Sequence, residues 1–210
     1  MQLIPVIELL PSDYGRQTHP LPIGSSAELT KAYYYLWKAS LADSGITELE
    51  PIIPGSYFVP VDRIIDPSTI EKILHVCLKS NDEYDLVGGY ALVVDENITI
   101  LPTCCCDLGN IDSWEMAAAW TSPQDEMVWI GHPWLLVHAI GDMLYFTETT
   151  EGDDQAQQPI FIISRFDLLR AIEVAHEQLN AFAERILPVM KAVFPGNLRI
   201  IINRLLYFDA

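Results

Sequence analysis

Three consecutive cysteines, Cys104 to Cys106, are the residues of this chain whose types and spacing most suggest chemistry. Side chains alternate along an extended backbone, so we expect Cys104 and Cys106 on one side and Cys105 on the other. Two thiolates from one strand, joined by His132 or Asp107, are donors of the kind that bind zinc. Protein zinc sites, however, usually draw on Cys-x-x-Cys pairs, and this sequence contains none.

A nucleophilic site would need a thiol activated by an imidazole that a third polar group orients. The residues available for it are Cys106 and His132 with Asp107 or Asp142. Free cysteine also behaves as a small hydrophobe, so the sequence favours packing over metal binding or catalysis for the triplet. A small hydrolase or metal-dependent enzyme that uses Cys104, Cys106 and His132 is the alternative hypothesis. We expect no cofactor, and the pair Gly88-Gly89 is not followed by a phosphate-loop motif.

Aromatic residues gather around the same part of the chain. Four of the five tryptophans lie between positions 101 and 134, and two of them, Trp129 and Trp134, flank His132. Aromatic residues are enriched at interaction hot spots, and binding groups are often carried on loops. We predict a recognition face made by Trp129, His132, Trp134, Asp107 and Asp142.

The charge balance limits the kinds of partner. The chain carries 29 acidic and 12 basic residues, a formal net charge of −17. Such a field repels nucleic-acid phosphates and anionic lipid, so we expect neither a nucleic-acid nor a membrane partner. It would suit a basic protein partner, or simply keep the protein soluble. The sequence leaves the partner and the oligomeric state open.

The cellular compartment of the protein is predicted from features that the sequence lacks. No segment has the roughly 20 consecutive apolar residues that a membrane-spanning helix needs. The N-terminal residues have no basic leader, and Pro5 and Glu8 interrupt their apolar run. The spacing of the cysteines does not resemble a disulfide framework. A reduced, cytoplasmic protein is therefore expected.

Periodicity and capping signals predict an α+β fold, with an antiparallel sheet packed against helices. Expected helices cover residues 25–42, 66–78 and the region of Trp114, and a long C-terminal helix starts after Ser164 and is kinked or ended by Pro188. Expected strands cover residues 57–59, 90–94, 98–101, 127–130, 134–140, 143–147 and 160–163. We expect a single domain over 1–210, with an irregular segment at 1–24. The pattern does not distinguish strand from helix over 197–208.

Two resemblances follow from these motifs. The segment Pro102-Thr103-Cys104-Cys105-Cys106-Asp107-Leu108, then Trp114 and Trp129-Ile130-Gly131-His132-Pro133, resembles a bacterial family of no established activity with a P-x-C-C-x-x-L motif. More weakly, Gly88-Gly89 before a strand and the hairpin around Gly141-Asp142 are similar to the SUKH superfamily of immunity proteins. That resemblance implies an α+β domain that neutralises a toxin by binding it. We therefore expect a non-enzymatic binding module, with a basic toxin or effector as the partner of an immunity-type inhibitor.

Overall fold

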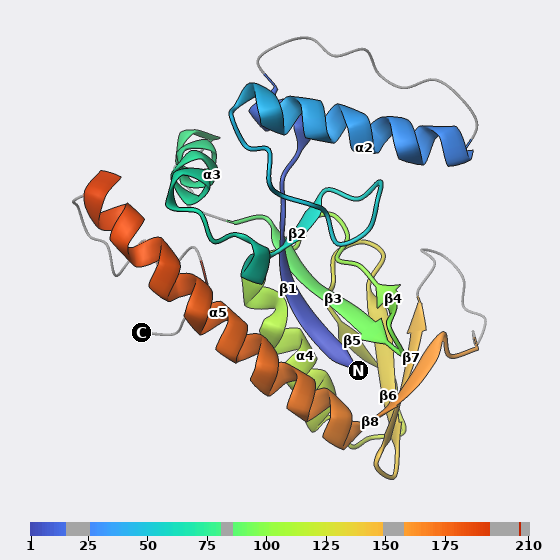
Figure 1. Ribbon diagram of the computed structural model, residues 1–210. Coiled ribbons are helices and arrows are strands. Elements are labelled where there is room, and N and C mark those ends of the chain that lie inside the picture. The colour runs from blue at the N-terminus through green and yellow to red at the C-terminus, as the bar shows by residue number, and fades with distance from the viewer. Residues whose placement is uncertain (16–25, 81–85, 149–157, 194–205, 207–210) are drawn as a thin grey trace. The chain divides into compact units, whose positions relative to one another are not determined.

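A computed structural model describes residues 1–15, 26–80, 86–148, 158–193 and 206 of the chain (Figure 1). It confirms the α+β class and the long C-terminal helix, α5 (Arg165–Val193). The strands form two four-stranded sheets, ordered β2-β1-β3-β4 and β5-β6-β7-β8, where the sequence predicted one. None of the helices within the described ranges is both long and apolar enough to cross a membrane.

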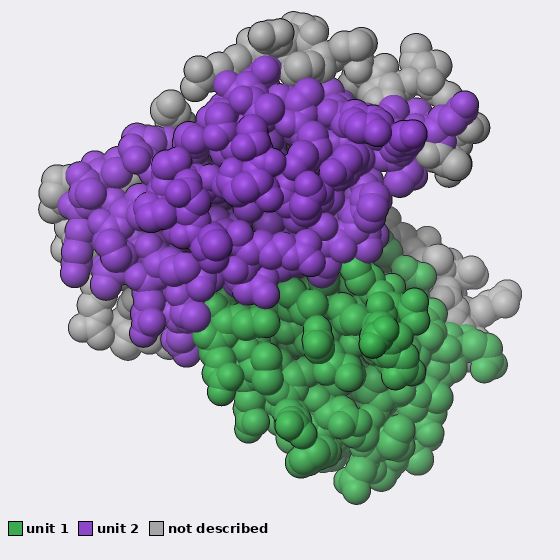
Figure 2. All heavy atoms as spheres, in the orientation of Figure 1, with its two compact units in different colours: residues 1–5, 87–179 green, residues 6–86, 180–210 purple. Residues whose placement is uncertain are grey.

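The single domain contains two compact units, neither of which is a continuous stretch of chain (Figure 2). Unit 1 comprises residues 1–5 and 87–179, and unit 2 comprises residues 6–86 and 180–210. Strand β1 (Gln2–Glu8) and helix α5 each contribute residues to both units.

The prediction of an irregular segment over 1–24 is wrong for the first residues. Residues Gln2–Glu8 form β1, and Pro11–Tyr14 form the short helix α1. Most of β1 is buried, including neighbouring residues that point to opposite faces, so its sequence reads as an apolar run without alternation. The strand was not predicted because it contains Pro5, and proline is usually excluded from strands that are hydrogen-bonded on both sides.

Besides α1 and the second part of β1, unit 2 contains α2 (Ser26–Asp43), β2 (Phe58–Pro60), the 3-10 turn η1 (Val61–Arg63), α3 (Pro67–Ser80) and the C-terminal part of α5. The prediction for the start of α3 is confirmed, because the Thr69 amide donates to Asp66 Oδ2 at 2.9 Å. Trp37 of α2 is fully buried, and its Nε1 donates to the Leu9 carbonyl oxygen at 2.8 Å. The capping residue predicted for α2, Ser25, lies outside the described residues.

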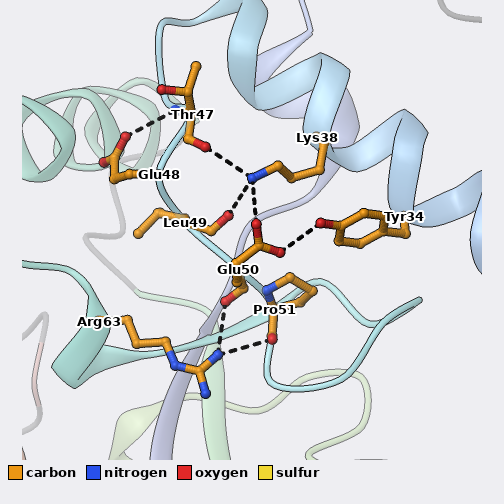
Figure 3. Close-up of polar contacts among 8 residues, drawn as sticks. All are labelled: Tyr34, Lys38, Thr47, Glu48, Leu49, Glu50, Pro51 and Arg63. Atoms are coloured by element: carbon orange, nitrogen blue, oxygen red, sulfur yellow. Dashed lines mark hydrogen bonds and ion pairs between the residues drawn. The ribbon is translucent and has the colours of Figure 1, made fainter.

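Polar contacts hold the irregular chain after α2 against that helix (Figure 3). Lys38 Nζ donates to the carbonyl oxygens of Thr47 at 3.0 Å and Leu49 at 2.9 Å. It also pairs with Glu50 Oε1 at 2.8 Å, while the Tyr34 hydroxyl donates to Glu50 Oε2 at 2.8 Å. The hydrogen bond from Lys38 lowers the pKa of the Glu50 carboxyl. One ammonium group thus satisfies three acceptors of a segment that lacks regular secondary structure.

Unit 1 contains the hairpin β3 (Gly88–Val94) and β4 (Asn97–Ile100), the 3-10 turn η2 (Leu108–Asn110) and helix α4 (Ile111–Ala119). Its second sheet consists of β5 (Glu126–Val128), β6 (Leu135–Ile140), β7 (Met143–Glu148) and β8 (Phe161–Ser164), each antiparallel to the next. Trp114 of α4 is fully buried with its ring 6.0 Å from that of Phe146. The side of the β5–β8 sheet that carries Phe146 is its inner face. It forms the core of unit 1 with Val128, Leu135, Val137, Ala139, Leu144 and Ile163.

Helix α5 does not end at Pro188. The sequence predicted that Pro188 kinks or ends the helix; because the helix continues through it to Val193, the second alternative is wrong, and the kink stays a prediction. The undetermined segment 197–208 lies outside the described residues except for Leu206, which is helical and buried.

Candidate functional site

Two loops of unit 1 bring two cysteines and a histidine together. Sγ of Cys104, Sγ of Cys105 and a ring nitrogen of His132 all lie within 4.8 Å of one another, and all three residues are exposed. We call these three residues the cysteine–histidine cluster. Its members come from positions nearly thirty residues apart, so tertiary structure and not local sequence assembles it.

Backbone contacts fix the two loops against each other. The amide and the hydroxyl of Thr103 both donate to the Ile130 carbonyl oxygen, each at 2.9 Å. Cys104 and His132 then form an isolated antiparallel bridge. Gly131, the residue before His132, has φ +102°, and a Cβ on it would overlap the carbonyl oxygen of Cys104. The close approach of the two backbones therefore requires glycine at this position.

The cluster differs by one cysteine from the set predicted from sequence. Cys105 has φ +65°, a left-handed conformation that ends the alternation expected of an extended backbone. Cys105 therefore lies with Cys104 and His132, while Cys106 is buried at 3% exposure. The prediction of Cys104 and Cys106 on one side, used with His132, is wrong for that reason.

The environments of the thiols also differ. Burial is the main cause that raises the pKa of Cys106 to about 12. The hydrogen bond with Cys104, and then the charge of Cys104, raise the pKa of Cys105. Because the thiolate is the nucleophile, Cys106 is poorly suited to the nucleophilic role considered above. Its Sγ contacts the Cys104 carbonyl oxygen at 3.9 Å and packs inside the loop.

The structure brings three of the five predicted recognition residues together. The His132 ring centroid lies 4.8 Å from that of Trp129 and 5.6 Å from that of Trp134, in edge-to-face arrangements. The two indoles are nearly parallel, at 18° and 6.4 Å. Trp129 directly follows Val128, and Trp134 directly precedes Leu135; these two residues form the last pair between β5 and β6. Both indoles are half-buried, and the imidazole between them is exposed.

The other two predicted residues belong to other elements of unit 1. The Asp107 carboxylate accepts from the Gly109 amide at 2.8 Å and forms a capping box with Asn110, so it begins η2. Asp142 occupies the β6–β7 turn, at the opposite end of β6 from Trp134. A strand rises about 3.3 Å per residue, so the length of β6 alone separates Asp142 from Trp134 by roughly 20 Å.

Sequence reasoning missed an apolar surface on the β5–β8 sheet. The outer sheet face, opposite the core, carries Met127 at 45% exposure, Ile140 at 57%, Met143 at 37% and Ile162 at 49%. An antiparallel sheet usually turns polar side chains to water. The apolar and aromatic members of this face, half-buried ones included, are Met127, Leu136, His138, Ile140, Met143, Tyr145 and Ile162; Thr147, which is buried, and Ser164 lie on the same side.

The register connects this face to the aromatic group. Met127 pairs with Leu136, and the next alternate residues are Trp129 and Trp134, just beyond the ends of the two strands. Across the middle of the sheet His138 pairs with Tyr145, and their rings stack at 5.0 Å. Apolar and aromatic side chains thus extend from the cysteine–histidine cluster to the β6–β7 turn. The signal was available in the sequence, since β6 and β7 carry apolar residues at both alternating positions.

Charge is distributed unevenly around this surface. Between Lys79 and Arg165 the chain has no lysine or arginine and has fifteen aspartate and glutamate residues. Two of these acids border the outer sheet face: Asp125 precedes β5, and Asp142 lies in the β6–β7 turn. Asp125 Oδ1 lies 3.1 Å from Nδ1 of His138. The apolar face therefore has an acidic border.

Comparison with known proteins gives no relative from which a function could be transferred. No protein-family model matches the chain, and neither a curated protein nor a solved structure shows significant similarity to it.

Proposed function

We propose that this protein is a non-enzymatic binding module whose partner is a basic protein, and that the outer sheet face with Trp129 and Trp134 is its binding surface. The observation that carries the proposal is the exposure of Met127, Ile140 and Ile162 on one side of an antiparallel sheet. Contiguous apolar surface of this kind typically marks an interaction site.

The composition of the surface is that of a binding hot spot. Hot spots are rich in tryptophan and tyrosine, and their centres are depleted of charged residues. Trp129, Trp134 and Tyr145 supply the aromatic side chains, and the carboxylates lie at the border. Desolvating the centre would supply affinity, while the border would select the partner by charge.

The charge of the partner follows from the border. A segment with fifteen acidic residues and no lysine or arginine attracts a cationic surface and repels an anionic one. A protein whose basic surface surrounds an apolar patch fits this arrangement. The basic cleft of a nuclease-like toxin has that chemistry, which supports an immunity-type inhibitor as the specific form of the proposal.

The test combines partner capture with surface variants. The purified protein is immobilised, and host extract is passed over it at about 0.15 M salt, where exposed charges more than roughly 8 Å apart are screened. Retained proteins are identified by mass spectrometry, and the partner is produced separately to measure its Kd. In the variant Ile140→Lys/Ile162→Lys, two exposed apolar side chains are replaced by cations. We expect the Kd for the basic partner to rise at least about 30-fold, since hot-spot truncations exceed about 1 kcal/mol each.

The matched control is Ile65→Lys, which places the same substitution at a position 67% exposed in unit 2. Its Kd should equal that of the unaltered protein. Retention of no basic protein, or equal weakening by the control and the double variant, would refute the proposal.

A further inference from the structure

The geometry points to a metal site: Cys104, Cys105 and His132 bind one Zn²⁺ ion through two thiolates and one imidazole, with the fourth position open to an exogenous ligand. The inference is independent of the proposed binding function. It also differs in composition from the ligand set that alternation along a strand predicts, because Cys105 replaces Cys106.

The donor atoms are already close to coordinating distances. Tetrahedral zinc with Zn–S bonds of about 2.3 Å and Zn–N bonds of about 2.0 Å places neighbouring donors roughly 3.5 to 3.8 Å apart. The three donors here lie within 4.8 Å of one another. Small rotations of these exposed side chains would bring the donors closer to coordinating separations.

The backbone holds the three residues in this arrangement. The bridge between Cys104 and His132 fixes two of the ligands directly opposite each other. The left-handed conformation of Cys105, at φ +65°, brings the third to the same side. A preformed arrangement favours binding, because less conformational entropy is lost when the ion enters.

The surroundings of His132 restrict its ring. Trp129 and Trp134 contact the imidazole edge-to-face from two sides, with centroids at 4.8 Å and 5.6 Å. These contacts limit rotation of the ring, as second-shell hydrogen bonds do at many metal sites. The ring is nevertheless exposed, so an ion can reach it.

The donor types select the metal. Thiolate and imidazole ligands suit zinc and other thiophilic ions, whereas Mg²⁺ and Ca²⁺ require oxygen donors. Within the described ranges of the chain, no carboxylate or further imidazole joins the three donors. Three protein ligands and one exchangeable position are the arrangement of an open zinc site.

Cobalt provides the direct test. The full-length protein is treated with chelator, desalted, kept reduced with a phosphine and titrated with Co²⁺ under nitrogen. We expect thiolate-to-cobalt charge-transfer absorption and strong visible bands of tetrahedral Co²⁺, saturating at one equivalent. Added Zn²⁺ should displace Co²⁺ and abolish the spectrum, and the Kd of the protein for Zn²⁺ should be below about 1 µM. Absence of a thiolate-to-cobalt band, or a vicinal disulfide that persists in the reductant, would overturn the proposal.

Single-residue variants identify the ligands. Cys105→Ser should weaken Zn²⁺ binding at least about 100-fold, because loss of a second-shell contact alone typically weakens it 10- to 100-fold. Cys106→Ala and Cys77→Ala should keep the cobalt spectrum, with folding checked by circular dichroism. Loss of the spectrum in Cys106→Ala but not in Cys105→Ser would refute the assignment.

Alkylation gives a second readout. Bound Zn²⁺ should protect Cys104 and Cys105 from iodoacetamide, as read by peptide mass spectrometry, and equal labelling with and without Zn²⁺ would count against the site. Capture of the basic partner is measured in parallel with Cys105→Ser. Trp129 and Trp134 take part in both proposals, but Cys105 belongs only to the metal site, so failure of metal binding with intact partner capture refutes this inference alone.

Discussion

At the scale of single residues, Gly131 marks a close approach of two backbone segments in unit 1. A methyl group there would meet the Cys104 carbonyl oxygen and the Thr103 hydroxyl, at a φ of +102° that side chains rarely adopt. We expect Gly131→Ala to lower the free energy of unfolding by about 2–4 kcal/mol through steric overlap and backbone strain. Urea denaturation followed by tryptophan fluorescence would measure the change.

Gly141 provides a matched comparison for this substitution. It also has positive φ, +61°, but nothing lies within 4 Å of a Cβ built on it. Gly141→Ala should therefore show only the strain of the left-handed conformation, about 1 kcal/mol. Equal destabilisation by the two substitutions would show that the contact between the two loops contributes nothing.

Glu8 is expected to destabilise the protein at neutral pH. Burial raises the pKa of its carboxyl, and the nearby Asp13 raises it further. A raised pKa means that the folded state favours the protonated form. The stabilisation associated with that form is fully present below the unfolded pKa and is lost as pH rises through the folded pKa. Glu8→Gln should thus raise the thermal midpoint at about pH 7 and change it little near pH 4.

The control for this prediction is Glu177→Gln, an exposed carboxylate on α5. It should leave the midpoint unchanged at both pH values. A midpoint for Glu8→Gln that falls at neutral pH would show that the ionised carboxylate stabilises the fold.

The sequence predicted part of the candidate site and missed the rest for a physical reason. Trp129, His132 and Trp134 are so close in the chain that their association follows from local sequence. Cys105 joins His132 only because its φ is positive, and alternation along a strand predicts the reverse. A local backbone conformation set by tertiary contacts was therefore the missing information.

At the scale of elements, Arg165 joins two helices of unit 1. Its guanidinium donates to the carbonyl oxygens of Ala118 and Trp120 at the C-terminal end of α4. Its own amide donates to the Asp142 carbonyl oxygen at 2.8 Å, at the start of α5. A cation at the C-terminal end of α4 also interacts favourably with the dipole of that helix. We expect Arg165→Met to lower the free energy of unfolding by about 2–3 kcal/mol, because two carbonyl groups lose charged donors.

Arg170→Met is the matched control for this loss. Arg170 lies on the same helix and is exposed, so its removal should change stability by less than about 0.5 kcal/mol. Chemical denaturation of both variants, followed by circular dichroism, would compare them. Equal changes would show that a net loss of positive charge, and not capping of α4, explains the effect.

Most elements were predicted because their signals are local. Asp66-Pro67 begins α3 by capping, and Gly141-Asp142 forms the β6–β7 turn as its glycine-first chemistry indicates. Strand β1 was missed, since its packing outweighs the local effect of Pro5, and of the two outcomes expected of Pro188 the end of α5 does not occur. Strand β8 and the outer sheet face show the same limit: periodicity located the strands but did not reveal that both faces are apolar.

At the scale of the whole molecule, the division into two units was not predictable from sequence order. Each unit combines residues from separate parts of the chain, and β1 and α5 contribute to both. Signals along the chain, such as linkers and changes in composition, identify domains that follow one another. They carry no information when the units are interleaved, as they are here.

The net charge of −17 predicts how the whole molecule responds to salt. Like charges repel in the folded state, and most of the excess lies in the segment between Lys79 and Arg165 that has no basic residue. Raising NaCl from about 10 mM to about 150 mM shortens the screening length from roughly 30 Å to 8 Å. We expect the thermal midpoint to rise by about 2–4 °C, corresponding to about 1 kcal/mol for a chain of this size.

Calorimetry with NaCl and with choline chloride would separate general screening, which both salts provide, from binding of sodium. A midpoint that stays constant or falls in both salts would mean that the carboxylates are compensated in the folded state, and would remove charge attraction as a reason to expect a basic partner.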